Sequence, residues 1–273
     1  MFAELVSDAP VQVAPDGARS CRYSIVCGDR VMGGLELKVE PSAPQTGHVH
    51  FPAHGRSDQG ANHSASVVTA AERLLRDWGC TTVRVRAPRR EAEELLAKLG
   101  YRSVSRIMVK ELGTRPDLPP SVGARTLTQE EFEAFVRAAQ AQYALSFVGR
   151  GFPLAEAEKI ARSATTSLLP NGLATQGVAL RCLVEQEEIV GRLWVADSGP
   201  APEPGAYVYD VEVAEGRRGR GFGRALMLHA EQIAWDWGCR RMGLNVVEGN
   251  TVAERLYASL GYRTTLHSIA RDL

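Results

Sequence analysis

The sequence predicts an α/β protein made of two similar domains, for three reasons. Its 273 residues are about twice the usual size of a domain. Part of the chain is repeated, since residues 71–80 read AERLLRDWGC and residues 230–239 read AEQIAWDWGC. Helical and strand-like patterns alternate around both copies. A content of 44% hydrophobic and 23% charged residues is ordinary for a globular protein.

The repeat extends beyond this first match. The sequence Leu-Gly-Tyr-Arg occurs at residues 99–102 and again at 260–263, and Glu111-Leu112 corresponds to Asp272-Leu273. A repeat of this length is a duplicated domain rather than a solenoid unit of about 20–50 residues. We therefore expect a first domain at residues 1–113, a proline-rich linker at 114–123 and a second domain at 124–273, each domain closing with helix, strand, helix and strand.

The second half begins with one strand and two helices. Residues 124–127 have the pattern of a short strand, and Thr128 is a suitable N-cap for a helix that reaches about Tyr143. Pro153 begins another helix, which we expect to end near Leu169 because the turn sequence Leu-Pro-Asn-Gly follows.

Strands and helices alternate in the rest of the second half. Residues 178–184 and 189–195 alternate between apolar and polar side chains and predict a hairpin. After a loop at 199–205, a strand is expected at Tyr207–Val213 and a helix over Ala225–Trp237.

Between that strand and that helix, residues 217–223 read Arg-Arg-Gly-Arg-Gly-Phe-Gly. Glycines at 219, 221 and 223 permit positive φ, and the first N–H groups of the helix have no partner within the helix. A helix N-terminus of this kind binds anions. Arg217, Arg218 and Arg220 add positive charge. The segment therefore predicts a site for a phosphorylated cofactor.

The spacing of this segment is neither that of a dinucleotide-binding fingerprint nor that of a P-loop. It reads Arg218-x-x-Gly221-x-Gly223, and about thirty residues later a second motif comprises Asn250, Ala253, Tyr257, Gly261 and Tyr262. Together the two motifs resemble those of the GNAT superfamily of N-acyltransferases. The resemblance covers residues 124–273, and about 20–112 as a divergent copy without the first two helices.

The resemblance implies a fold, a cofactor and a set of site residues. Each GNAT-like domain would be a mixed, mostly antiparallel sheet flanked by helices, and acetyl-CoA would be the co-substrate. The backbone amides of Val211 and Val213 would bind the pantetheine arm, Asn250 would orient the cofactor, and Tyr257 would protonate the coenzyme A thiolate. The rest of the cofactor site would be Arg218, Gly219, Arg220, Gly221, Phe222, Gly223 and Arg224.

An amine acceptor must lose a proton before or during its attack, so a base is needed. Asp210 and Glu212 alternate with valines on the strand before the loop. We expect Glu212 to be the general base, the alternative being an acid that is solvated or paired with Arg192. The expected reaction is direct acetyl transfer from acetyl-CoA to a primary amine in the C-terminal domain.

In the first half of the repeat, other residues occupy the positions that correspond to the proposed cofactor-binding and catalytic residues. The counterparts of Arg218, Gly221, Phe222, Gly223, Asn250 and Tyr257 are Gln59, Asn62, His63, Ser64, Arg89 and Leu96. We therefore expect one working site per chain and a degenerate N-terminal domain without a cofactor site. His48, His50, His54 and His63 match no metal-ligand spacing, so no metal is expected.

The acceptor is expected to be a small-molecule or peptide amine, and no motif specifies it further. Tyr143, Phe147, Arg150 and Phe152 lie in the expected acceptor region, and antibiotic amines, polyamines, peptide N-termini and amino acids all stay open. A non-catalytic acyl-CoA sensor or interaction protein is the alternative function, although a sensor has no use for an acid such as Tyr257. An RNA-binding arginine loop is a third, and it would require affinity that falls steeply with salt.

Charge and hydropathy exclude other classes of partner. A net charge of +0 disfavours a nucleic-acid-binding surface. No apolar run is long enough to predict a membrane span, and the N-terminus has no pattern of a signal peptide. These features predict a cytoplasmic protein, as a monomer or a homodimer.

Overall fold

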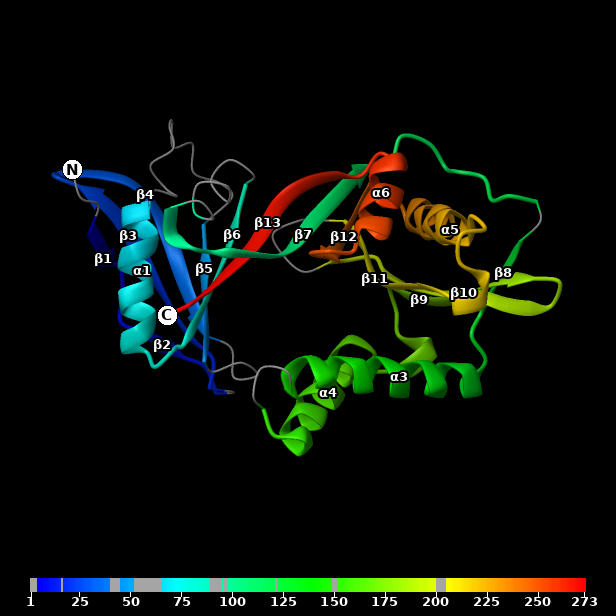
Figure 1. Cartoon of the computed structure of the whole chain (residues 1–273), viewed down its shortest axis with the longest axis horizontal. Helices are drawn as coiled ribbons and strands as arrows, with labels where there is room; N and C mark the ends of the chain where they lie inside the picture. Colours follow the sequence, from blue (N-terminus) through cyan, green and yellow to red (C-terminus); the bar gives the residue numbers. More distant parts are fainter. Residues whose placement is uncertain are drawn as a thin grey trace. The chain divides into compact units, whose positions relative to one another are not determined.

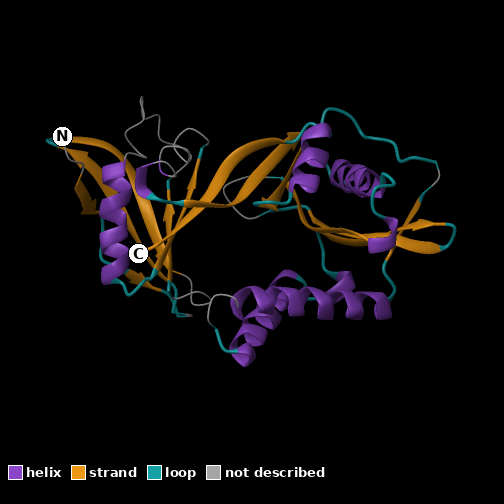
Figure 2. Ribbon diagram, viewed as in Figure 1, coloured by secondary structure: helices purple, strands orange, loops and turns teal. Residues whose placement is uncertain are grey.

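The computed structural model describes residues 4–15, 17–39, 45–51, 65–88, 95, 98–120, 122–148, 152–199 and 205–273. It has the expected mixed α/β fold, in which mostly antiparallel strands are flanked by helices (Figure 2). The chain forms two compact units that interleave in sequence. The first is drawn from residues 1–108, 246–254 and 263–273, and the second from 109–245 and 255–262.

Helix α1 (Ala65–Asp77) packs against the sheet of the first unit. Neighbouring strands follow the order β1-β3-β4-β5-β6-β13, with β2 beside β3. The β5–β6 pair is parallel, and the other pairs are antiparallel. Helix α1 buries Val68 and Leu75 in the core. The strands are β1 (Glu4–Ser7), β2 (Gln12–Val13), β3 (Arg19–Cys27), β4 (Arg30–Val39), β5 (Thr46–His50), β6 (Thr82–Ala87), β7 (Arg102–Glu111, mostly in this unit) and β13 (Arg263–Asp272).

The second unit has helices on both faces of its sheet. Its strands follow the order β8-β9-β10-β11-β12, antiparallel except for β11–β12. Helices α3 and α4 lie on one face and α5 on the other (Figure 1). The elements are β8 (Gly123–Thr126), α3 (Gln129–Val148), α4 (Leu154–Leu168), η1 (Gly172–Ala174), β9 (Val178–Glu185), β10 (Glu188–Ala196), β11 (Ala206–Val213), η2 (Glu215–Arg217), α5 (Phe222–Asp236), β12 (Arg241–Val247) and α6 (Thr251–Ser259), the last two shared with the first unit.

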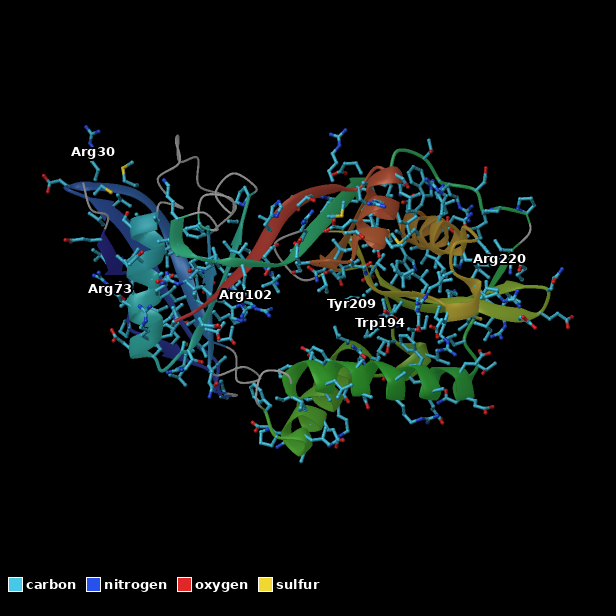
Figure 3. The ribbon with its side chains drawn as sticks, viewed as in Figure 1. Arg30, Arg73, Arg102, Trp194, Tyr209 and Arg220 are labelled. Atoms are coloured by element: carbon cyan, nitrogen blue, oxygen red, sulfur yellow. The ribbon has the colours of Figure 1, made fainter. Side chains whose placement is uncertain are left out.

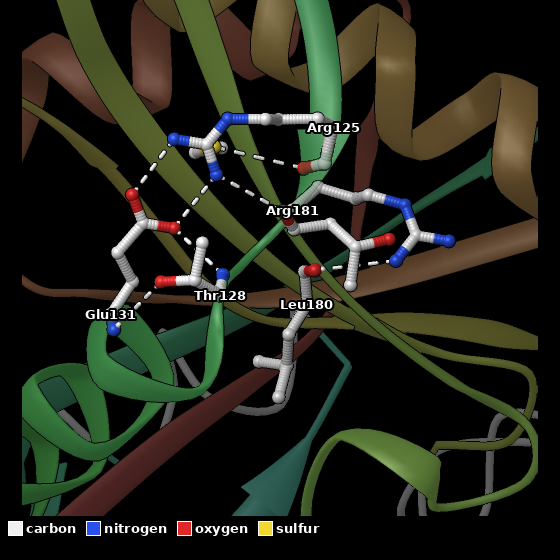
Figure 4. Close-up of polar contacts among 7 residues, drawn as sticks. Arg125, Thr128, Glu131, Leu180 and Arg181 are labelled. Atoms are coloured by element: carbon white, nitrogen blue, oxygen red, sulfur yellow. Dashed lines mark hydrogen bonds and ion pairs between the residues drawn. The ribbon is translucent and has the colours of Figure 1, made fainter.

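Helix α3 begins at the predicted N-cap, where a capping box forms (Figure 4). The Glu131 N–H donates to Thr128 Oγ1 at 3.3 Å, and the Thr128 N–H donates to Glu131 Oε2 at 2.7 Å. Arg125 also donates to both Glu131 oxygens, at 2.7 and 2.8 Å, and its hydrogen bonds are the main cause that lowers the pKa of Glu131 to about 2. The helix continues past the predicted end at Tyr143 because no glycine or proline precedes Val148.

The predicted hairpin and the helix after Pro153 are also present. Strands β9 and β10 pair from Glu185 and Glu188 onward, which leaves a two-residue turn. Both turn residues, Gln186 and Glu187, have positive φ, at 50° and 68°, as a turn that follows the twist of a hairpin requires. Pro153 is the N-cap of α4.

Each half contributes to the compact unit of the other half, since β13 lies in the first unit and the end of β7, from Val109 onward, lies in the second. Strand β13 pairs with β6 from Asp272↔Thr82 to His267↔Ala87, and the Leu273 N–H donates to the Thr81 oxygen at 2.8 Å. In the second unit the Leu112 N–H donates to the Arg240 oxygen, also at 2.8 Å. Because residues 99–112 correspond to 260–273, these contacts are reciprocal. The boundaries of the compact units therefore differ from the predicted domain boundary at residues 114–123. The division into domains at this linker stays a prediction.

Candidate functional site

The arginine and glycine loop joins β11 to α5, as the sequence predicts. Gly219 and Gly221 have φ of 77° and 86°, and Gly221 is the N-cap of α5 without a side-chain hydrogen bond to the helix. A Cβ atom added to either glycine would meet nothing within 4 Å. The glycines are needed for the backbone conformation, and the space beside them is open. The first turn of α5 thus presents N–H groups without a side-chain cap, which suits a phosphate.

Gly223 has a different role from the one we expected. It lies inside α5 and is not among the glycines with positive φ. A Cβ at this position would lie 3.1 Å from Leu256 Cδ2 and 3.7 Å from Val213 Cγ2. Gly223 therefore allows close packing of α5 against α6 and β11, rather than an unusual turn.

The loop arginines differ in their partners. Arg220 forms an ion pair with Glu185 at 2.9 Å, and Arg217 pairs with Glu185 and Glu188 on the β9–β10 hairpin. Arg218 Nε donates to the Val213 oxygen at 3.4 Å, and Arg224 donates to Ser259 Oγ at 2.9 Å. Glutamates therefore neutralise part of the charge that the sequence suggested. Among the described residues, Arg218 and Arg224 have no carboxylate within ion-pair distance.

Strand β11 contains a bulge at the centre of the candidate site. Trp194 of β10 pairs with Asp210, but the next residue of β10, Val195, pairs with Val208, so Tyr209 is an extra residue. The parallel register with β12 ends at Val208↔Leu244, while β11 continues to Val213. Val211 and Val213 therefore lie past the last residue pair that joins β11 to β12.

Asp210 and Tyr257 are two titratable side chains of this unit whose pKa values are raised. Burial, followed by the charge of Glu212, raises the pKa of Asp210 to about 6. Tyr257 is only 6% exposed, and burial, followed by the charge of Asp210, raises its pKa to about 12. At neutral pH Asp210 is therefore ionised and can accept a proton, whereas Tyr257 holds one and can donate it.

The two acids of β11 differ in exposure, which the sequence could not show. Glu212 is exposed, whereas Asp210 is partly buried and its charge contributes to the raised pKa of Tyr257. Burial and a raised pKa make Asp210 a second candidate base beside Glu212, whose role stays a prediction. The strand pattern placed both acids correctly on β11, but the bulge that changes their surroundings has no sequence signal here.

Asn250 caps a helix. Its Oδ1 accepts a hydrogen bond from the Ala253 N–H at 3.2 Å, and its backbone oxygen accepts one from Glu254 at 3.0 Å, at the start of α6. It belongs to the first compact unit, so its role toward a cofactor stays a prediction. The expected counterparts of the site in the first half, and two further predicted residues, lie outside the described residues: Gln59, Asn62, His63, Ser64, Arg89, Leu96, His54 and Arg150.

Comparisons with known proteins agree with this geometry. Residues 155–262 match the model of the acetyltransferase (GNAT) family. The chain is 32% identical over 138 residues to the uncharacterised N-acetyltransferase YycN of Bacillus subtilis, which covers 50% of this chain and 88% of YycN. The chain therefore belongs to the acetyltransferase (GNAT) family.

Two solved structures share the fold over nearly the whole chain. A GCN5-related N-acetyltransferase from Sphaerobacter thermophilus has a TM-score of 0.52 and 20% identity, covering 95% of this chain and 79% of its own. A tandem GNAT protein from the clavulanic acid biosynthesis pathway has a TM-score of 0.52 and 16% identity, covering 95% and 85%. At such identities the likeness concerns the fold alone.

The described residues contain neither a membrane-spanning helix nor a group of side chains that could hold a metal ion. No helix in those ranges is long and apolar enough to cross a bilayer. In the same part of the chain, no group of three or more His, Cys, Asp or Glu side chains could hold a metal ion.

Proposed function

We propose that this chain transfers an acetyl group from acetyl-CoA to a primary amine by direct attack, and that residues 206–262 carry the chemistry. One observation supports this most strongly. A glycine loop at a helix N-terminus lies in the same compact unit as an ionised, partly buried Asp210 and a protonated Tyr257, whose pKa the charge of Asp210 helps to raise. Anion binding, proton acceptance and proton donation are the three properties that acyl transfer to an amine requires.

The loop residues fit the cofactor. Acetyl-CoA would supply the acetyl group as a reactive thioester. The uncapped N-terminus of α5 would bind its phosphates, with Arg218 and Arg224 as the cations that lack a carboxylate partner among the described residues. The N–H groups of Val211 and Val213 would bind the pantetheine arm and polarise the thioester carbonyl.

The acids and the tyrosine would then move the protons. Asp210, or Glu212 as the sequence suggested, would take a proton from the acceptor ammonium. The free amine attacks the thioester carbon, the carbon–sulfur bond breaks, and Tyr257 protonates the departing thiolate. The second proton that the nitrogen loses as the amide forms returns Tyr257 to its protonated state. Asp210 suits its part because its pKa of about 6 leaves it ionised yet basic at neutral pH.

The first half of the repeat would be a degenerate GNAT-like domain with no turnover of its own. This rests on the sequence, which has Gln59, Asn62 and Leu96 at the positions of Arg218, Gly221 and Tyr257. The fold likeness to a tandem GNAT protein over 95% of the chain supports the same arrangement. One molecule of acetyl-CoA should therefore bind per chain.

Calorimetry with acetyl-CoA tests the proposed cofactor site. Gly221→Val should abolish binding, because valine strongly disfavours a φ of 86° and would occupy the open space beside the helix N-terminus. Gly216→Val is the matched control, since Gly216 lies in the same loop, has open space around it and is not among the glycines with positive φ. Two equivalent sites per wild-type chain, or unchanged binding by Gly221→Val, would contradict the proposal.

A further inference from the structure

Two buried N–H donors lie on one face of β10 without a hydrogen-bond partner among the described residues. Trp194 is 8% exposed and its Nε1 makes no hydrogen bond, and Arg192 Nε is also buried and unsatisfied. The two residues are two apart on a strand, so their side chains point to the same face. Trp194 packs edge-on against Phe135 of α3 and stacks on Tyr209, so this face is the one covered by α3 (Figure 3).

Two carboxylates lie directly across from these donors on β11. Arg192 pairs in register with Glu212, and Trp194 pairs with Asp210. Residues paired in this way have Cβ atoms about 5 Å apart and share a face of the sheet. Even so, no hydrogen bond or ion pair joins Arg192 to either acid in the described part of the chain. The guanidinium is nevertheless close enough for its charge to oppose the rise in the pKa of Asp210.

Several buried polar atoms of the described residues have no hydrogen-bond partner, and these two donors share one face of β10. A buried donor without a partner costs about 1–3 kcal/mol, and such groups in native proteins are few. Two of them beside the proposed base are explained if a substrate completes their hydrogen bonds. An arginine edge and an indole N–H together suit a carboxylate, while the two acids opposite suit an ammonium group.

We propose that the acceptor is an amine that also carries a carboxylate a few bonds from the reacting nitrogen, as in an amino acid, and that Arg192 and Trp194 bind this carboxylate. The inference rests on the proposed function and narrows its substrate class. The acceptor amine lies toward the acids of β11 and its carboxylate toward β10, so the strand register orients the nitrogen for attack.

Acetylation of matched acceptor pairs tests the inference. Each pair is an amino acid and its decarboxylated amine: tyrosine and tyramine, histidine and histamine, lysine and cadaverine. With acetyl-CoA as donor, wild-type kcat/KM for at least one amino acid should exceed that of its amine by about tenfold or more, the size expected for a charge-assisted contact. In Arg192→Gln this preference should fall to within about threefold, with acetyl-CoA affinity unchanged.

Two further variants keep the test sharp. Trp194→Phe retains the ring packing, removes the indole N–H, and should reduce the preference in part. Arg181→Gln is the matched control, because Arg181 is a partly buried arginine on the neighbouring strand, but its register partner Leu193 lies on the opposite face from Arg192. It should leave the preference intact.

The outcomes separate the two proposals. Equal acetylation of both members of every pair, or a preference that survives in Arg192→Gln, would overturn the carboxylate site while leaving acetyl transfer to amines intact. Absence of acetylation for every member, with acetyl-CoA bound, would overturn both. Thermal unfolding of each variant shows whether a loss of activity follows from misfolding.

Discussion

Among the described residues each compact unit contains one buried glutamate, and the two glutamates have different surroundings. In the first unit Glu72, 2% exposed, accepts a hydrogen bond from Tyr101 at 2.8 Å and contacts Arg271 at 3.3 Å and Arg76 at 3.8 Å. In the second unit Glu231, also 2% exposed, contacts Lys110 at 2.7 Å.

The repeat explains what is shared. Glu72 corresponds to Glu231, and Lys110 corresponds to Arg271. In both units the cation comes from the last strand of the other half, β7 or β13. The buried charge and its partner strand have therefore been kept together, whereas the loop chemistry differs between the two halves. A buried carboxylate tolerates loss of its cation poorly, which accounts for this linkage.

The comparison also shows an asymmetry. Among the described residues, Glu72 contacts two cations, Arg76 and Arg271, whereas Glu231 contacts Lys110. Tyr101 donates to Glu72, and the corresponding Tyr262 lies close enough to Glu231 for that carboxylate to raise the pKa of its hydroxyl. One Glu231 oxygen has no hydrogen-bond partner among the described residues. Glu231 thus depends on Lys110 more than Glu72 depends on Arg271.

Removing the first half should have the largest effect. A fragment of residues 121–273 lacks β6, the partner of β13, and lacks Lys110, the partner of Glu231. We expect it to aggregate or to lose cooperative unfolding, as measured by size-exclusion chromatography and circular dichroism. Co-expression with residues 1–120 should restore a folded complex. A soluble, monomeric and fully active fragment would show that the exchanged strand is dispensable.

Single substitutions of Lys110 and Arg271 should show how much each buried glutamate depends on its cation. Lys110→Met leaves Glu231 buried without its cation and should cost about 3–5 kcal/mol of unfolding free energy. Arg271→Met should cost clearly less, because a second cation, Arg76, still contacts Glu72. Urea unfolding compares the two, and adding Glu231→Gln to Lys110→Met should recover much of the loss. Equal costs would disprove the asymmetry.

Tyr257→Phe probes chemistry that only the second half should have, since its counterpart is Leu96. The variant keeps the buried ring but loses the proton donor, so turnover should fall by about ten- to a thousandfold while acetyl-CoA affinity is retained. Tyr23→Phe is the control, because Tyr23 is an equally buried tyrosine, 6% exposed, of the first unit. If Tyr257→Phe turned over as fast as wild type at every pH, Tyr257 would contribute to packing only.

Asp210→Asn should change the free energy of unfolding least. It should raise this free energy at neutral and higher pH, whereas the substitutions of Lys110 and Arg271 should lower it. The folded pKa of Asp210, about 6, lies above its ordinary value of 3.8, so the folded state binds the proton more tightly. This stabilisation is present below pH 4 and is lost as the pH rises to about 6. The variant should therefore be more stable than wild type at pH 8, by about 1–3 kcal/mol, and equal near pH 3.5.

The same variant separates the two candidate bases. If Asp210 is the base, wild-type kcat/KM rises with pH through about 6, and Asp210→Asn loses most of its activity. Glu212→Gln should then have a minor effect. Full activity in Asp210→Asn with a loss in Glu212→Gln would return the role to Glu212, as the sequence first indicated.

Local signals in the sequence predicted much of the second unit. The capping box at Thr128, the start of α4 after Pro153 and the hairpin of β9 and β10 depend on neighbouring residues, so their patterns suffice. The glycine loop was also placed correctly between β11 and α5.

Long-range arrangements could not be predicted in this way. An alternating pattern specifies a strand but not its partner, so the pairing of β13 with β6 has no local signal. Likewise, the residues around Gly223 do not reveal that Leu256 packs against it, and the environment of Asp210 depends on a bulge at Tyr209. Each of these features depends on residues that are distant in the sequence.

The pairing of β13 with β6 determines when the protein can fold during synthesis. A nascent chain exposes the edge of β6 until β13 has left the ribosome, so the first unit cannot be completed as soon as its own half is made. Such distant pairing slows folding and leaves an unpaired edge open to aggregation. Limited proteolysis of ribosome-bound chains that end at residue 262 should show an unprotected first unit, and early protection would contradict this delay.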